Sequence, residues 1–182
     1  MAAMLLAALA GLCPTRGASG EGEASSEYAV KAAFLFHFAQ FVDWPAGSFA
    51  ATNSPFVYCT AGSDPFRGAL DTTLSGKTTG GRGFEVRHLK QAREVQGCHL
   101  LFIGIEQEKQ TTSTVTQLQA APVLIVGESG GFVERGGTIG FSVEANKVRF
   151  EINLEAAEKS KLKISAKLLA LAKTVIGGPK RG

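Results

Sequence analysis

The feature that most constrains this fold is an aromatic segment near the N-terminus, VKAAFLFHFAQFVDWP at residues 30–45. It holds four of the twelve Phe residues and the only Trp. Read as a helix, it carries an apolar stripe formed by Val30, Phe34, Phe38 and either Phe41 or Val42. Phe36 lies off that stripe, so apolar surface wraps most of the helix. Pro45 disfavours helical geometry at Trp44 and predicts the end of the helix there.

A helix that is apolar nearly all round must be covered on most sides. Two arrangements provide that cover: the segment is the central core helix of one domain, or part of its aromatic face docks a partner. It is too short, and too often interrupted by polar residues, to span a membrane. With 182 residues, 45% of them hydrophobic and 19% charged, the chain fits one domain with a sizeable core.

The charge balance excludes one class of partner. A net charge of +3 is too small to indicate nucleic-acid binding. The only basic cluster lies near the C-terminus and comprises Lys159, Lys161, Lys163, Lys167 and Lys173. Such a set usually forms a solvated helix face, and the alternative is contact with an acidic protein or with lipid headgroups.

An apolar run at residues 4–12, followed by small residues, predicts a signal peptide and disordered leader over residues 1–24. Because no Lys or Arg precedes the run, an unstructured tail is the alternative. Leu12 is too bulky to precede a lipidated Cys13, which argues against a lipoprotein. We therefore expect an exported protein with one domain at residues 25–178 and a frayed tail at 179–182.

Removal of the leader leaves two cysteines, Cys59 and Cys98, both in strand-like runs. An even count in an oxidising compartment favours a disulfide between them. The alternative is a pair of buried thiols that act as small hydrophobic groups. Neither cysteine lies in a CxxC motif and the three histidines are scattered, so the sequence predicts no metal site and no cofactor.

The middle of the chain alternates between strand and helix patterns. The predicted strands are residues 55–60, 84–88, 98–103 and 122–126. The predicted helices are residues 65–75, capped by Asp64, then a weak helix at 90–96 and a polar helix at 106–120. Because these spacings need crossover connections, we expect an α/β fold: a single three-layer domain with a mostly parallel central sheet flanked by helices.

The pattern changes after a glycine-rich loop at residues 127–137. Alternating apolar residues predict an antiparallel hairpin over residues 138–153, with its turn at Ala145 and Asn146. One or two helical turns at residues 154–160 come next. A closing helix over about residues 162–176 is predicted from the stripe Ile164, Leu168, Leu171 and Val175.

No residue pattern predicts catalysis. The glycines at 127–131 follow a strand, but a phosphate loop would need a helix to begin there. His37, His88 and His99 neighbour no Ser or Cys arrangement that forms a relay in sequence. We therefore expect a protein that is not an enzyme and has no catalytic residue.

Several blocks resemble the YfiR family of small periplasmic proteins. They are the aromatic segment with Trp44-Pro45, GCHLLFI at 97–103, GFVERGGTI at 131–139, VRFEIN at 148–153 and LKISAKLL at 162–169. Asp64-Pro65-Phe66 and Gly76-Lys77 also fit, and the resemblance extends from about Glu27 to Val175.

The resemblance implies a regulator. Understood members of the family bind the periplasmic sensor domain of an inner-membrane diguanylate cyclase and repress it. Release by an outer-membrane lipoprotein or by redox stress raises cyclic-di-GMP and promotes biofilm formation. Members are usually dimers, and Cys59 and Cys98 match a family cysteine pair that can form a disulfide. A second pair found in some relatives is missing here, which weakens the case for strong redox switching.

We expect the partner surface on the exposed side of the aromatic helix and at the hairpin. The candidate contacts are Phe36, His37, Gln40, Trp44 and Phe141. The alternative function is a periplasmic small-ligand sensor with a pocket under the glycine-rich loop 127–137. A third reading, a hydrolase that uses His or Glu residues from loops, has no relay spacing to support it.

Overall fold

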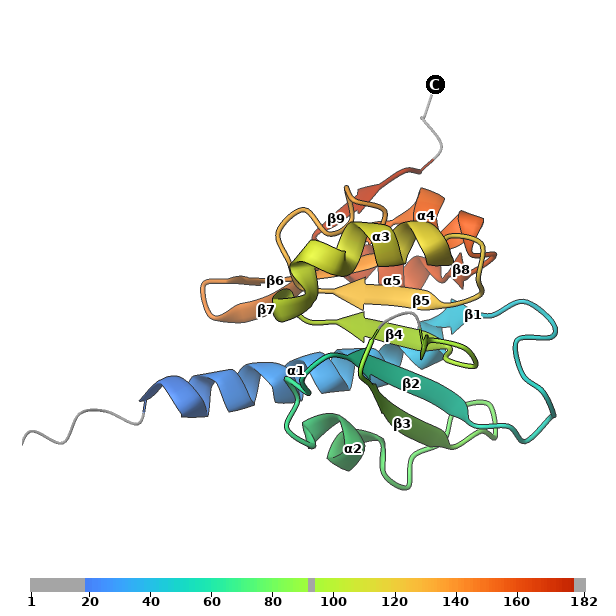
Figure 1. Ribbon diagram of the computed structural model, residues 1–182, viewed down its shortest axis with the longest axis horizontal. Helices are drawn as coiled ribbons and strands as arrows, with labels where there is room; N and C mark the ends of the chain where they lie inside the picture. The colour runs from blue at the N-terminus through green and yellow to red at the C-terminus, as the bar shows by residue number, and fades with distance from the viewer. Residues whose placement is uncertain (1–18, 92–93, 179–182) are drawn as a thin grey trace, which may run out of the picture.

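The computed structural model describes residues 19–91 and 94–178 (Figure 1). The predicted tail and all of the predicted leader except residues 19–24 lie outside this part. A seven-stranded sheet has the order β3-β2-β4-β5-β6-β7-β9. Its strands are β2 (Phe56–Ala61), β3 (Phe84–Leu89), β4 (Leu100–Ile103), β5 (Leu124–Gly127), β6 (Ile139–Glu144), β7 (Lys147–Asn153) and β9 (Thr174–Ile176). Among the described pairs of this seven-stranded sheet, only β6–β7 is antiparallel.

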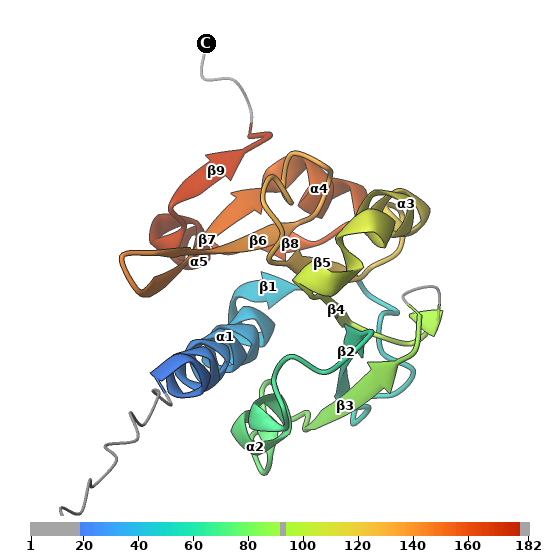
Figure 2. The same ribbon diagram turned by 60° about the vertical axis from the view of Figure 1, so that its left-hand side comes forward.

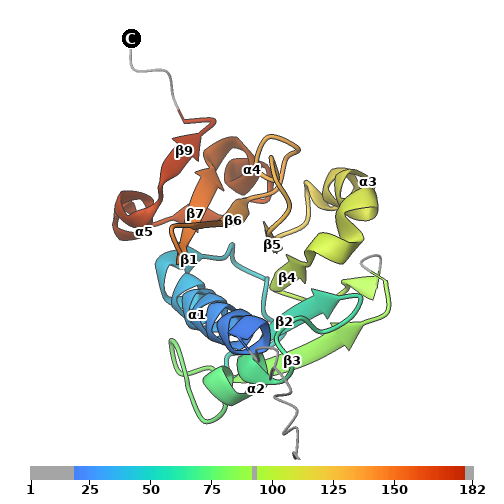
Figure 3. The ribbon, with the colours of Figure 1, turned by 90° about the vertical axis from the view of Figure 1, so that its left-hand side faces the viewer.

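Helices cover both faces of the sheet, as Figure 3 shows. The long α1 (Ser19–Phe41) lies on one face with α2 (Ala69–Leu74) and α5 (Ala166–Leu171), and α3 (Glu108–Leu118) lies on the other. The 3-10 helix η2 (Ile105–Gln107) precedes α3, and α4 (Leu154–Lys159) follows the hairpin. The predicted three-layer α/β class with a mostly parallel sheet is therefore confirmed.

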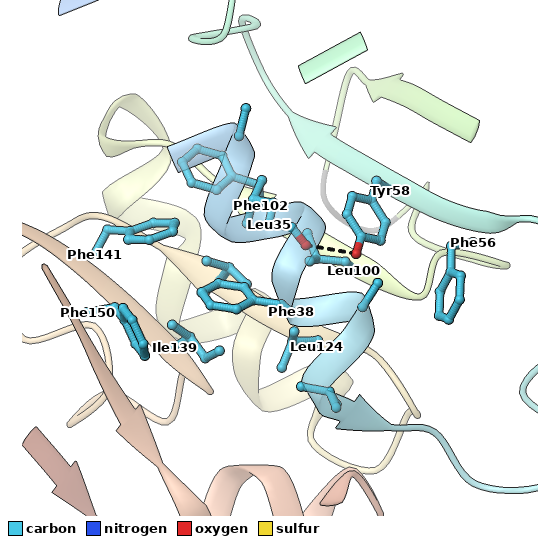
Figure 4. Packing of buried hydrophobic residues seen from close by; sticks show 14 of the residues in the cluster. Leu35, Phe38, Phe56, Tyr58, Leu100, Phe102, Leu124, Ile139, Phe141 and Phe150 are labelled. Carbon is cyan, nitrogen blue, oxygen red and sulfur yellow. Dashed lines mark hydrogen bonds between the residues drawn. The ribbon is translucent and has the colours of Figure 1, made fainter. Parts of the chain in front are cut away.

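Strand alternation divides the core into two clusters. On the α1 side the strands contribute Tyr58, Leu100, Phe102 and Leu124. On the α3 side they contribute Val57, Cys59, Leu101 and Ile125. Both faces of the central strands are buried, as expected for parallel strands with helices on each side. In Figure 4, Phe38 of α1 points toward Phe141 and Phe150 of the hairpin, and the Tyr58 hydroxyl donates to the Leu35 carbonyl at 3.0 Å.

The aromatic helix ends three residues before the predicted stop at Trp44. After Phe41 the chain becomes extended in β1 (Val42–Asp43), which pairs antiparallel with β8 (Lys163–Ile164). The Ser165 N–H also donates to the Phe41 carbonyl. The helix therefore ends because its last residues form hydrogen bonds with β8 and Ser165, before the chain reaches Pro45.

The closing helix predicted over about residues 162–176 is confirmed only as the short α5 (Ala166–Leu171), so its predicted bounds were wrong. The segment instead forms β8, α5 and β9. The Ser165 hydroxyl accepts from the Leu168 N–H, which starts a six-residue helix, and Ala172 is already extended at ψ 140°. β9 then pairs in parallel with β7, and this long-range pairing leaves no trace in helical periodicity. Leu171, predicted to be buried, is 64% exposed.

The hairpin turn is confirmed, because Ala145 and Asn146 both have positive φ, as a tight hairpin turn requires. The helix predicted from Pro65 begins only at Ala69, because Arg67 at φ 49° and Gly68 at φ 82° interrupt it. Part of the weak helix predicted at 90–96 lies outside the described residues.

Candidate functional site

The solvent-facing side of α1 is the most distinctive surface of the molecule. Exposed residues three or four positions apart form a continuous line, here called the α1 ridge: Ser26, Ala29, Val30, Ala33, His37 and Gln40. None of these positions holds Asp, Glu, Lys or Arg. A solvent-facing side of a surface helix normally carries charged residues. An uncharged exposed ridge on a helix whose opposite side fills the core is typical of an interaction surface.

Half-buried rings border the ridge and are fixed by the core. Phe34 packs edge-on against Phe150 with ring centroids 5.4 Å apart. Phe36 packs against Phe84 at 5.6 Å, and the Lys77 ammonium lies 4.5 Å above the Phe36 ring. These contacts hold the edges of the ridge in place before any partner arrives, which lowers the entropy lost on binding.

The hairpin extends this surface. It lies alongside α1 in Figures 1 and 2, and Phe34 of α1 contacts Phe141 of β6. Val143, near the end of β6, is 46% exposed, and Val30 on the ridge is 43% exposed. The exposed apolar groups of helix and hairpin therefore border the same side of the molecule.

The five predicted contact residues lie in three different places: at the ridge, beyond the end of the helix and in the core. His37 and Gln40 lie on the ridge, where His37 Nδ1 and Gln40 Oε1 are 3.0 Å apart, and Phe36 borders it. Trp44 lies beyond the helix, with its indole N–H donating to the His99 carbonyl at 3.3 Å. Phe141 is only 4% exposed and packs on Phe38, so it belongs to the core.

The disulfide between Cys59 and Cys98 is confirmed, with the two Cα atoms 6.0 Å apart. Both cysteines are buried in the cluster beneath α3. The bridge therefore joins β2 to the segment just before β4, on the sheet face opposite α1.

His99 is a structural histidine. Its Nδ1 accepts the Val57 N–H at 3.0 Å, so Nε2, at 3.0 Å from the Ser48 carbonyl oxygen, is the nitrogen that carries the proton. Its ring stacks on Phe49 with centroids 4.3 Å apart. Burial lowers the pKa of His99, the hydrogen bond to Ser48 opposes this, and the positive charges of Arg82 and Arg87 lower the pKa further. Both ring nitrogens are therefore engaged by backbone, and the neutral form is the stable one.

The other histidines lie elsewhere. His88 on β3 contacts the Thr60 hydroxyl at 2.9 Å, and His37 stays on the ridge. Within residues 19–91 and 94–178, no group of three or more His, Cys, Asp or Glu side chains could hold a metal ion. The glycine-rich loop is filled by its own Phe132, which is 2% exposed and whose ring contacts the positions of Gly127 and Gly137. That side chain fills the space between those two glycines, and a cavity of about 250 Å³ lies beside the loop at Glu134, Arg135 and Gly136.

An ion cluster at the carboxyl end of the sheet was not found from the sequence. Lys31 is 3% exposed and pairs with Glu27 and with Glu128, the latter at 2.6 Å. Glu128, which follows β5, also accepts from the Tyr28 hydroxyl at 2.9 Å and from the Ile105 N–H at 3.2 Å. The one local signal was a lysine inside an aromatic helix, whose partner lies 97 positions away.

The structure thus combines a three-layer α/β domain, an uncharged helix ridge and a histidine held by the backbone. The profile of the YfiR/HmsC-like family (DUF4154) matches residues 28–173. The chain therefore belongs to the YfiR/HmsC-like family, whose members are regulatory proteins of the periplasm. No curated protein sequence matches it.

One of two similar solved structures supports the fold, and the fold alone. A conserved domain protein from Vibrio cholerae O1 biovar El Tor superposes with a TM-score of 0.52 at 11% identity, over 81% of this chain and 60% of that one. An ABC domain from Streptococcus pneumonia in complex with L-Trp superposes with a TM-score of 0.49 at 12% identity, over 66% of this chain and 55% of that one. This chain thus spans less than two thirds of either protein.

None of the helices in the described part of the chain is long and apolar enough to cross a membrane.

Proposed function

We propose that this protein is a periplasmic regulator that binds the periplasmic sensor domain of an inner-membrane diguanylate cyclase and inhibits it. Family membership supports the signalling role. The observation that carries the contact surface is the α1 ridge, exposed over its whole length and free of charged residues. On this proposal, binding lowers cyclic-di-GMP and restrains biofilm formation.

Inhibition needs a difference in affinity between two conformations of the cyclase. A tenfold preference for the inactive conformation corresponds to about 1.4 kcal/mol. A few apolar contacts near the centre of an interface provide this much. Ala29, Val30 and Ala33 offer small, flat apolar surface that lets a partner helix or strand approach closely, and Phe36, His37 and Gln40 add contacts further along.

The resemblance implies two further partners, and the proposal includes both. One is an outer-membrane lipoprotein that sequesters the regulator, and the other is a second copy of the chain. The lipoprotein would relieve inhibition by competing for the regulator.

The test is Ala33→Glu, with Ala120→Glu as its matched control. Both alanines are exposed, but Ala33 lies on the ridge and Ala120 follows α3, on the other side of the sheet. A carboxylate in the middle of an apolar interface has to be desolvated without a partner. We expect Ala33→Glu to weaken capture of the sensor domain by at least about tenfold, and Ala120→Glu to bind like the wild type.

Cyclic-di-GMP levels in cells provide the second readout. Cells that carry Ala33→Glu should show the raised level of a strain without the protein, and Ala120→Glu should not. If both variants bound equally well, the ridge would not be the contact surface. If the wild-type protein captured no sensor domain, the function itself would be wrong.

A further inference from the structure

A cavity of about 770 Å³ lies at the carboxyl ends of β2 and β4. Its walls come from α1, from the loop between β2 and α2, from η2 and from Glu128 after β5. After β2 the chain forms β3 on one side of β2, and it then crosses over to form β4 on the other side of β2. The strand order therefore reverses between β2 and β4, and open α/β sheets bind ligands outside the carboxyl ends of strands at such a point.

The charges around this cavity are mainly negative. Asp64, Glu106 and Glu128 line it, and among the described residues of the lining Arg67 is the only basic one. Lys31 forms ion pairs with both Glu27 and Glu128. These six side chains carry four negative and two positive charges, so a bound cation would find a net attraction.

The phenol of Tyr28, which also lines the cavity, reports the same field. Burial raises the pKa of Tyr28, and the negative charges of Glu128, Glu27 and Glu106 raise it further. All three carboxylates therefore act on one atom at the cavity wall.

An anion does not fit the same place. The backbone N–H groups of Phe66 and Gly68 are the donors that an anion would use at the turn before α2. The Asp64 carboxylate already accepts both, at 2.9 Å and 3.1 Å. The Asp64 carboxylate thus takes the place that a bound anion would need at these two N–H groups.

The remaining walls are apolar and aromatic. Tyr28 and Phe66 meet edge to face with ring centroids 5.4 Å apart, and Pro65, Ala69 and Ile105 complete this side. A volume of this size suits a small organic ligand with an apolar body.

We propose that the cavity between α1, η2 and the β2–α2 loop binds a small organic cation: a primary ammonium group carried on an aromatic or branched apolar body. Glu106 is the ammonium acceptor. Its carboxylate accepts from the Ser63 hydroxyl and has lone pairs left for a second donor. Glu128 instead holds Lys31, Tyr28 and the Ile105 N–H, and keeps the wall in place. This site shares Ala29 with the α1 ridge but does not include Ala33, which the partner test changes, and it does not rest on the proposed regulatory function.

Three probes of nearly equal shape test the charge preference: phenethylamine, 2-phenylethanol and phenylacetate. Each is titrated into the full-length chain by isothermal calorimetry at pH 7. We expect phenethylamine to bind at least tenfold more tightly than the neutral alcohol, and phenylacetate not to bind. Equal affinity for the amine and the acid, or no heat from any probe, would overturn the proposal.

Variants then locate the site. Glu106→Gln keeps an acceptor for Ser63 but removes the charge, and should weaken phenethylamine at least fivefold while leaving the alcohol unchanged. Ala69→Leu narrows the cavity and should weaken both probes. Glu158→Gln removes an exposed carboxylate on α4, outside the lining, and serves as the matched control. Unchanged amine affinity in Glu106→Gln, or an equal loss in Glu158→Gln, would show that the cation binds elsewhere.

Discussion

At the amino ends of β2 and β4 the sheet is closed by neutral rings, whereas at their carboxyl ends it is bordered by ion pairs and a cavity. At the closed end, Phe49 packs between His99 and Phe56, and Trp44 packs on Phe56. The Arg82 guanidinium lies 4.0 Å above the Phe49 ring and donates to the carbonyls of Ala51 and Ser54. At the open end, Lys31, Glu27 and Glu128 hold α1 against the loops after β4 and β5.

The difference shows that the two ends of one sheet have different roles: the closed end contributes to stability, and the open end also provides a binding cavity. The groups at the closed end satisfy one another, so that little is left to attract a ligand. The charges at the open end have to be paired inside the protein, and they leave a negative field in the cavity beside them. We expect substitutions at the closed end to change stability alone, and those at the open end to change stability and binding together.

The largest effect should come from the bridge that ties β2 to the segment just before β4. Cys59 and Cys98 are 39 positions apart, and for a loop of that length the chain-entropy model gives about 4 kcal/mol. The double variant Cys59→Ala/Cys98→Ala should lose that much in free energy of unfolding, measured with urea. Its affinity for the sensor domain, corrected for the unfolded fraction, should stay unchanged. A loss below about 1 kcal/mol would contradict the expected role of the bridge.

Lys31→Met tests the open end. The change leaves Glu128 buried without its ammonium partner, and breaking such a pair costs about 3 kcal/mol. Urea unfolding should show this loss. The double variant Lys31→Met/Glu128→Gln should recover part of it, because the amide no longer needs a counter-charge. If the double variant lost more free energy of unfolding than the two single variants together, the Lys31–Glu128 pair would not be the source of the effect.

His99→Leu tests the closed end and its pH dependence. At pH 8 the variant should be less stable by about 2 kcal/mol, since the Val57 N–H and the Ser48 carbonyl lose their partner. Because the pKa of His99 is lowered in the folded protein, the unfolded chain takes up a proton near its ordinary value while the folded chain does not.

The stability that comes from neutral His99 is therefore complete above pH 6.5 and declines as the pH falls below it. The gap between wild type and His99→Leu should narrow from pH 8 to pH 5 in parallel urea titrations. A gap that widened toward acid would mean that the folded protein favours the protonated ring.

The smallest effect should come from Trp44→Phe. The change removes the indole N–H bond to the His99 carbonyl, which is 3.3 Å long, and keeps an aromatic ring against Phe56. We expect a loss of about 1 kcal/mol or less in urea unfolding. Sensor-domain binding should not change. If it fell sharply while stability held, Trp44 would belong to the partner surface and the ridge would extend past the helix.

Local patterns were sufficient for much of the fold. Two-sided apolar runs at residues 98–103 and 122–126 predicted central parallel strands, and β4 and β5 lie within or beside them. Alternation predicted the β6–β7 hairpin and its turn. Cysteine count and compartment predicted the Cys59–Cys98 bridge. Each of these signals lies in the residues of one element, or in a count that needs no geometry.

The candidate site was predicted only in part. The sequence placed a possible docking surface on the aromatic helix, and His37 and Gln40 do lie on its exposed side. Phe141 was mistaken for a surface residue because alternation along a hairpin gives two faces without saying which one is covered. The same limit explains the error at residues 162–176. Apolar residues every three or four positions there fit a helix, but the end of the segment pairs with β7 as strand β9 instead.

The sequence by itself determined the helices and strands with a strong period, the disulfide partners and the family, because each depends on neighbours in the chain or on residue identity. Only the tertiary structure decided which side of α1 meets water, where Lys31 finds its carboxylates and where the cavity opens. Those features depend on contacts between residues far apart in the chain, such as Tyr28 with Glu128 and Phe34 with Phe150. A pattern read along the chain carries no record of such contacts, since they are fixed by packing of the whole sheet.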